Sequence, residues 1–119
     1  MKEIYILEDD KDIGFILKYI LFEEGYNVTV YESLSEIRSA LQSHLPNLLL
    51  MDVRLPDGNG MDLCAELKQR EKLRLPVIMM SAHWDVKTGG RCGADEFIAK
   101  PFDLDQMVKK ISGYLGGPC

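Results

Sequence analysis

Five short apolar runs alternate along the chain with longer stretches whose apolar residues recur at helical spacing. Runs of this length predict strands, and the stretches between them can hold helices that cross to the next strand. Strands joined in this way pair in parallel through right-handed crossovers. The alternation therefore predicts an α/β fold: an open, doubly wound, five-stranded parallel sheet with helices on both faces. The expected strands are Ile4–Leu7, Asn27–Tyr31, Leu48–Met51, Val77–Met80 and Glu96–Ala99.

Helices are expected between and after these strands. The segment Asp12–Glu24 carries apolar residues at helical spacing. Ser33, with Glu36 three residues later, forms a capping box that begins the next helix. A third helix follows a turn-rich cluster and carries Cys64 on its apolar side, and the last helix begins near Asp103.

Length, charge and cysteine spacing exclude several classes of protein. The 119 residues predict one domain over residues 1–119, with no output domain, and the formal charge of −5 argues against direct nucleic-acid binding. No apolar run approaches the roughly 20 residues of a membrane span, and the acidic Glu8 follows the first run where a signal peptide would carry small residues. Cys64, Cys92 and Cys119 are too widely spaced to predict zinc or disulfides. We expect a cytoplasmic protein with a core-facing Cys64 and two free thiols.

Polar residues stand at the carboxyl ends of four expected strands. Glu8 and Asp9 follow the first strand, and Asp52 follows the third. Ser81 ends the fourth, and Lys100 comes just after the fifth. In an open α/β sheet these ends meet at one edge, where ligands bind. Three carboxylates brought together repel one another unless a cation neutralises them, and Mg²⁺ suits a site with few carboxylates.

These residue types match the needs of phosphoryl transfer. A metal ion, the Lys100 ammonium and the Ser81 hydroxyl can together stabilise three equatorial phosphoryl oxygens. Asp52 is the available nucleophile, since a carboxylate can form an acyl phosphate. Each residue alone also fits an ordinary structural role, such as a helix cap, an Asx turn or a surface lysine. Their joint placement on successive strand ends favours the site.

Taken together, the motifs resemble the receiver domain of two-component response regulators. The resemblance covers the chain from Ile4 to about Leu115. Any one motif is weak, but their order and spacing are specific. The motifs are Glu8-Asp9, Asp52, the stretch Leu55–Leu63, Ser81-Ala82 and the stretch Gly93–Phe102.

The resemblance implies a flavodoxin-like sheet with the strand order 2-1-3-4-5 and a role for each matching residue. Asp52 would accept a phosphoryl group from the phosphohistidine of a sensor histidine kinase or a phosphotransfer protein. Asp9, Asp52 and the Arg54 carbonyl would ligate Mg²⁺, with Glu8 acting mainly through metal-bound water. Lys100 would pair with the phosphoryl oxygens. Such a domain promotes its own phosphorylation and dephosphorylation but is not an enzyme for external substrates.

The resemblance also implies a conformational switch that controls a downstream partner or output domain. The Ser81 hydroxyl would swing toward the phosphoryl group, and Phe97 would change rotamer with it. The bond from Lys100 to Pro101 would be cis. Two positions depart from the common pattern: Glu8 replaces an aspartate, and Phe97 lacks a hydroxyl, so its inward state would depend on packing alone.

The stretch from Ser81 to Lys100 is about one helical turn shorter than is usual in the family. It contains Gly89-Gly90, and each glycine costs about 1 kcal/mol in a helix interior. We therefore expect a fourth helix that is short, distorted or mobile, which puts the usual output face in question. Trp84 in this stretch is either a partner contact or a hydrophobic cover for the loop.

Arg54 and His83 lie two residues beyond Asp52 and Ser81. In the family these positions flank the path of the hydrolytic water. Two bulky side chains there would either shield the acyl phosphate from hydrolysis or be plain surface residues, and the sequence leaves both interpretations open.

The histidine kinase is expected to contact the first helix and the loop before the last one. In this sequence those segments contain Ile13, Gly14, Leu17, Pro101 and Phe102. Helix positions that pack against a partner look like positions that pack against the core, so this assignment rests on the resemblance.

Two other functions and two chain organisations stay open. A phosphatase of the haloacid-dehalogenase type also uses an aspartate nucleophile and magnesium, but it would need a second aspartate where Arg54 stands. A receiver-like module that no longer depends on phosphate is favoured only by the shortened fourth segment. The chain is either a stand-alone receiver or an N-terminal piece of a longer regulator.

Overall fold

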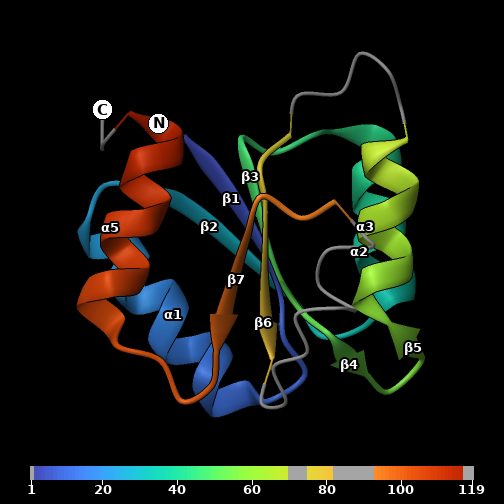
Figure 1. The fold of residues 1–119 in the computed structure, drawn as a ribbon, viewed down its shortest axis with the longest axis horizontal. Helices are drawn as coiled ribbons and strands as arrows, with labels where there is room; N and C mark the ends of the chain where they lie inside the picture. Colours follow the sequence, from blue (N-terminus) through green and yellow to red (C-terminus); the bar gives the residue numbers. More distant parts are fainter. Residues whose placement is uncertain (1, 70–74, 82–92, 117–119) are drawn as a thin grey trace.

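The computed structural model describes residues 2–69, 75–81 and 93–116. Within these ranges, five parallel strands form one sheet in the order β2-β1-β3-β6-β7 (Figure 1). Counted along the chain, these five strands have the order 2-1-3-4-5, which confirms the predicted fold class. The strands are β1 (Glu3–Leu7), β2 (Asn27–Tyr31), β3 (Leu48–Asp52), β6 (Val77–Ser81) and β7 (Glu96–Ala99).

Helices cover both faces of the sheet, as predicted. In Figure 1, α1 (Lys11–Glu23) and α5 (Leu104–Leu115) lie on one side, and α2 (Leu34–Ser43) and α3 (Gly60–Lys68) lie on the other. The segment expected to hold a short fourth helix, with His83, Trp84 and both glycines, lies outside the described residues. Across the described ranges, every helix is too short or too polar to cross a membrane.

The core divides into two layers, one on each side of the sheet. Leu48, Leu49, Leu50 and Met51 of β3 are fully buried. Leu49 and Met51 pack in the layer beneath α2 and α3, whereas Leu48 and Leu50 pack in the layer beneath α1 and α5. Because successive side chains of a strand point to opposite faces, a strand covered on both sides must be apolar throughout. The run Leu48–Met51 is therefore apolar throughout because helices cover both faces of β3, as the sequence predicted.

The helix ends follow their capping residues. The Asp10 carboxylate accepts hydrogen bonds from the N–H groups of Asp12 and Ile13, so α1 begins at Lys11, one residue before the predicted start. Ser33 Oγ accepts from Glu36 N at 3.3 Å, as the capping box requires. The Glu36 carboxylate, however, accepts from the N–H of Glu32 at 3.4 Å, so the reciprocal bond differs from the expected one.

A small hairpin replaces the turn expected after β3. It pairs β4 (Arg54–Leu55) with β5 (Gly58–Asn59) in antiparallel register. The hairpin is fixed to α2 by Asp57, whose carboxylate accepts from the N–H groups of Leu34 at 2.9 Å and Ser35 at 3.0 Å. Sequence reasoning placed only a turn here, because two-residue strands carry no periodic pattern.

Candidate functional site

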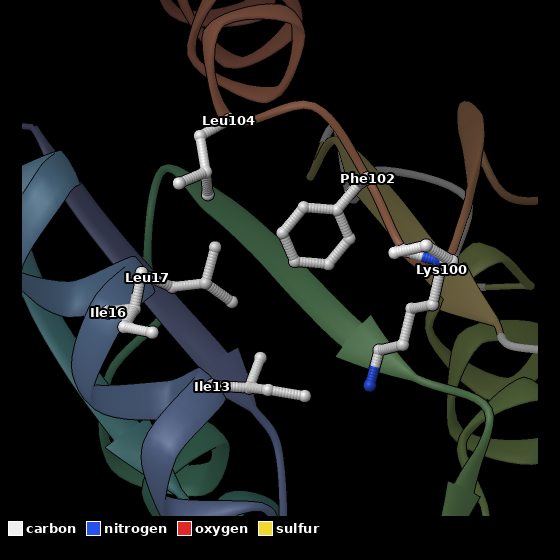
Figure 2. A pocket seen from close by; sticks show the side chains of 7 residues that line it. Ile13, Ile16, Leu17, Lys100, Phe102 and Leu104 are labelled. Atoms are coloured by element: carbon white, nitrogen blue, oxygen red, sulfur yellow. The ribbon is translucent and has the colours of Figure 1, made fainter.

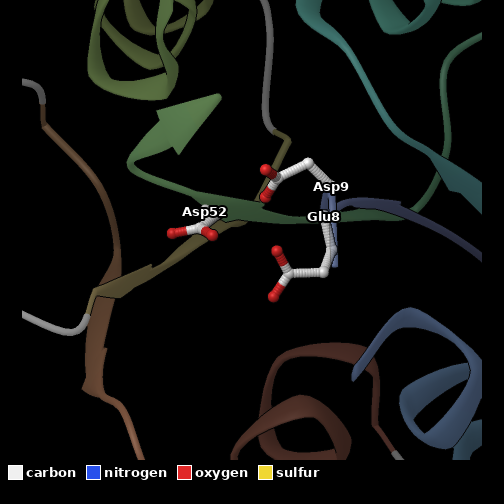
Figure 3. A group of neighbouring side chains, drawn as sticks. All are labelled: Glu8, Asp9 and Asp52. Atoms are coloured by element: carbon white, nitrogen blue, oxygen red, sulfur yellow. The ribbon is translucent and has the colours of Figure 1, made fainter. Parts of the chain in front are cut away.

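Four of the predicted site residues meet at one edge of the sheet. Figure 3 shows the side chains of Glu8 and Asp9, just beyond the end of β1, beside that of Asp52 at the end of β3. One carboxylate oxygen from each residue lies within 4.8 Å of the others. Lys100, which follows β7, reaches the same place. The strands β1, β3, β6 and β7 are neighbours in one parallel sheet, so their carboxyl ends lie along the same edge.

The Lys100 ammonium joins two of the three carboxylates. Its Nζ donates to Glu8 Oε1 at 2.5 Å and to Asp52 Oδ2 at 3.0 Å. The Glu8 side chain is fully buried, and the side chains of Lys100 and Asp52 are only 15% and 13% exposed. The peptide bond between Lys100 and Pro101 is cis, as the family resemblance implied.

Burial and hydrogen bonding shift the pKa values of both Glu8 and Lys100. Burial raises the pKa of the Glu8 carboxyl to about 7, and the nearby Asp52 carboxylate adds to the rise, while the hydrogen bond from Lys100 opposes it. Burial on its own would lower the pKa of Lys100, but the hydrogen bonds to Glu8 and Asp52 outweigh it and the pKa rises. The ammonium therefore stays charged beside both acids.

The position of Asp52 depends on close backbone packing. Val53 N–H donates to Asp52 Oδ1 at 2.8 Å, and Gly60 N–H donates to the Val53 carbonyl at 2.7 Å. A Cβ on Gly60 would lie 2.2 Å from the Asp52 carbonyl oxygen, so only glycine fits at the start of α3. Sequence reasoning placed Gly60 in a turn cluster but gave it no role in the site.

The donor set suits a hard cation. Glu8, Asp9 and Asp52 offer only carboxylate oxygens, and the group ranges from the fully buried Glu8 to the exposed Asp9. Mg²⁺ prefers oxygen ligands and keeps several of its waters, so a site that is open on the Asp9 side fits it. Arg54 begins β4 close to Asp52 in the chain, and its side chain is exposed.

Two further predicted residues lie on the neighbouring strands. Ser81 is buried at the end of β6, where its carbonyl accepts from Lys100 N–H at 2.8 Å. Phe97 is half-buried on β7 opposite Met79 and packs against the core layer beneath α2 and α3. Ser81 therefore touches the Lys100 backbone, and Phe97 lies along the strand that carries Lys100.

An apolar groove of about 410 Å³ opens beside Lys100. Figure 2 shows Ile13, Ile16 and Leu17 facing Phe102 and Leu104 across it, with Lys100 at one end. The sequence predicted a partner surface here but missed Ile16 and Leu104. Gly14, which it included, is buried and faces Val30 instead. The full lining consists of Ile13, Ile16, Leu17, Lys100, Pro101, Phe102 and Leu104.

Comparisons with known proteins agree with this architecture. The family model described as response regulator receiver domain matches residues 4–112. The DNA-binding transcriptional regulator NtrC of Salmonella typhimurium is 36% identical over 111 residues, which cover 91% of this chain and 24% of the relative. The phosphate regulon transcriptional regulatory protein PhoB of Rhizobium meliloti is 34% identical, with 97% of this chain and 52% of the relative covered. The chain therefore spans between a quarter and about half the length of these relatives.

Solved structures show the same fold. A putative response regulator from Chloroflexus aurantiacus superposes with a TM-score of 0.88 at 29% identity, covering 97% of this chain and 98% of that one. The receiver domain of the TMAO respiratory system response regulator TorR gives a TM-score of 0.86 at 29% identity, with 98% of each chain covered.

Proposed function

The chain belongs to the response regulator receiver domain family of two-component signalling, and we propose that Asp52 accepts a phosphoryl group from the phosphohistidine of a sensor kinase or phosphotransfer protein. The observation that carries the proposal is the hydrogen bond from Lys100 Nζ to Asp52 Oδ2 within a cluster of three carboxylates. A fixed cation beside a largely buried carboxylate is the arrangement that phosphoryl transfer to that carboxylate needs.

We assign Asp52 Oδ2 as the attacking oxygen. Oδ1 accepts a hydrogen bond from the Val53 N–H, whereas Oδ2 accepts one from the Lys100 ammonium and so lies beside the cation that would pair with the incoming phosphoryl oxygens. A bond forms between Oδ2 and phosphorus as the bond from phosphorus to the imidazole nitrogen breaks. The electron pair of that bond stays on the nitrogen, and the imidazole leaves as the neutral ring with its proton on the other nitrogen. Lys100 neutralises one phosphoryl oxygen, and the Ser81 hydroxyl donates to another.

Mg²⁺ would be held by Asp9 and Asp52, with the Arg54 carbonyl as a further ligand and Glu8 acting through a metal-bound water; when bound, it supplies positive charge against the phosphoryl oxygens. The chain's own residues set up this charge balance. Glu8 supplies a buried carboxylate, Asp9 an exposed one, and Lys100 a second positive charge in contact with both Glu8 and Asp52.

The apolar groove beside Lys100 supports docking of the kinase's helical domain. Ile13 and Leu17 form one wall, and Pro101 and Phe102 form the other. A helix seated here would present its histidine next to Lys100, which lines the same groove. The partner's apolar face would thus position the phosphohistidine, while the polar edge of the sheet performs the transfer.

The output would follow from a change at Ser81 and Phe97. Movement of the Ser81 hydroxyl toward the phosphoryl group would open space that Phe97 fills, converting local charge into a change of surface. The domain then acts on a downstream partner or an output domain in the cytoplasm. NtrC and PhoB are named transcriptional regulators, but we propose no direct nucleic-acid contact for this domain.

Acetyl phosphate labelling, read by intact mass, tests the proposal. We expect a magnesium-dependent gain of one phosphoryl group that is absent from Asp52→Asn. An Asp52→Asn variant that gains the same mass would place the acceptor elsewhere. No gain by the folded wild-type protein would favour a module that does not depend on phosphate.

A further inference from the structure

Helix α1 exposes a stripe of aromatic side chains to solvent. Phe15, Tyr19 and Phe22 are 71%, 59% and 60% exposed. Of the six large apolar side chains that are exposed in the described part of the chain, four lie on α1: these three and Ile16. We name Phe15, Tyr19 and Phe22 the aromatic stripe. Large exposed apolar patches on a soluble domain mark interaction surfaces.

The stripe is separate from the face with which α1 packs on its own sheet. Gly14, Leu17 and Leu21 form that inner face and are buried. A helix with a single apolar face needs only the sheet to cover it, whereas α1 is apolar on two faces. The spacing of four and then three residues along the stripe is the alternation of a and d positions in a coiled-coil heptad.

Charged residues flank the aromatic stripe in a pattern that favours a second copy of α1 as its partner. If Phe15 and Phe22 take d positions, Lys18 takes a g position and Glu23 an e position. In a parallel helix pair, a g residue meets the e residue five positions further along the other helix. Lys18 of one copy would therefore meet Glu23 of the other, and neither residue has an ion-pair partner among the described residues.

We propose that a second copy of this chain covers the aromatic stripe, with the two α1 helices packed in parallel about a two-fold axis. An antiparallel pair would set the Lys18 flank against the Lys18 flank of the other copy, so charge favours the parallel arrangement. The same geometry brings the two Asp12 carboxylates together at the start of the helix, which limits the close contact to the segment from Phe15 onward.

The area of the stripe sets the strength of the contact. Aromatic side chains bury roughly 150–250 Å² each, so rings exposed to this degree offer roughly 300–450 Å² per copy. Two copies with their flanking side chains reach about 1,000 Å², the lower bound of a specific interface. The dimer is therefore weak and depends on concentration.

Dimerisation would bear on partner docking. Ile16 lies next to the stripe at an e position and also lines the groove beside Lys100. A second copy on α1 would cover this edge of the groove and compete with a docked kinase helix. This consequence, unlike the dimer itself, rests on the proposed function.

Sedimentation equilibrium of the full chain tests the dimer, without phosphodonor or metal and over a concentration series reaching the millimolar range. We expect a monomer–dimer equilibrium that Lys18→Glu or Glu23→Lys each weakens roughly tenfold, since each creates two like-charge contacts. The Lys18→Glu, Glu23→Lys double variant should restore the wild-type constant, and Asp12→Asn should strengthen it.

The matched control is Lys109→Glu, which makes the same charge change at an exposed position of α5 and should leave the equilibrium unchanged. Circular dichroism confirms that each variant is folded. A wild-type protein that stays monomeric throughout the series would overturn the proposal. So would a double variant as weak as the single variants, because it would place the contact on another face. Acetyl phosphate labelling does not enter this measurement, so its failure leaves the dimer test intact.

Discussion

The Lys100 ammonium lies 2.5 Å from Glu8 Oε1, closer than its 3.0 Å contact with Asp52 Oδ2. The extra methylene of a glutamate, where an aspartate is more common, carries the carboxylate to the lysine. The sequence predicted that Glu8 would act mainly through metal-bound water. The structure adds a direct ion pair between Glu8 and Lys100.

The affinity of the site for Mg²⁺ should rise as the pH passes through about 7. Glu8 has a pKa of about 7 because it is buried, and a carboxylate helps to hold a cation only when it is ionised. Calorimetric titration with Mg²⁺ between about pH 6 and pH 8 measures this dependence. Glu8→Gln should bind more weakly at the higher pH and lose most of the dependence. An equal pH dependence in the variant would assign the titration to another group.

The stability of the metal-free protein should carry the opposite signature. Because folding raises the pKa of Glu8 from 4.5 to about 7, the folded state favours the protonated acid. This contribution to the free energy of unfolding is fully present below pH 4.5 and is lost as the pH rises through about 7. The loss should be roughly 1–3 kcal/mol. Urea unfolding at a series of pH values should show it in wild type and not in Glu8→Gln.

Gly60→Ala should destabilise the domain and impair the site together. The added Cβ would lie 2.2 Å from the Asp52 carbonyl oxygen, so β3 or α3 must shift. We expect a loss of about 1–3 kcal/mol in unfolding free energy and slower labelling by acetyl phosphate. Gly113→Ala is the control: its Cβ meets nothing within 4 Å inside α5, so it should stabilise by about 0.5–1 kcal/mol. Equal effects of the two variants would contradict the role given to Gly60.

Ile13→Ala should separate partner docking from chemistry. Ile13 lines the groove beside Lys100 but does not belong to the cluster of Glu8, Asp9 and Asp52. Transfer from a cognate phosphohistidine protein should slow several-fold, while labelling by acetyl phosphate should be unchanged. Leu45→Ala, at an exposed aliphatic position outside the groove, should change neither rate. Slower labelling of Ile13→Ala by acetyl phosphate would mean that the substitution disturbs the site itself.

The shielding hypothesis predicts a shorter acyl-phosphate lifetime in Arg54→Ala. The Arg54 side chain is exposed at the start of β4, and only Val53 separates it from Asp52 at the end of β3. The decay of the phosphoryl mass after removal of the phosphodonor measures the lifetime. An unchanged lifetime would assign Arg54 to the ordinary surface. The second residue of the hypothesis, His83, lies outside the described residues and is tested by the same decay in His83→Ala.

Local patterns were enough to predict the elements and their order. All-apolar runs such as Leu48–Met51 indicate strands buried on both faces, because the alternate side chains of such a strand all pack against the core. The capping residues Ser33 and Asp103 fixed two helix starts. The sequence places Glu8, Asp52 and Lys100 at the ends of predicted strands. Parallel topology alone then brings them together, since it sets every carboxyl end at one edge of the sheet.

Only the tertiary structure determined the contacts between residues that are distant in sequence. Glu8 is the acid nearest to Lys100 because of its side-chain length and its depth of burial. Neither property can be predicted from the spacing of residues in the sequence. The close approach of Gly60 to the Asp52 carbonyl depends on how the short β4–β5 hairpin folds back. The hydrogen bond from the start of α2 to the Asp57 carboxylate depends on the same fold. The sequence by itself determined which groups share an edge, because backbone periodicity and chirality act locally. Only packing determined which atoms touch, because it depends on distances of a few ångströms between separate elements.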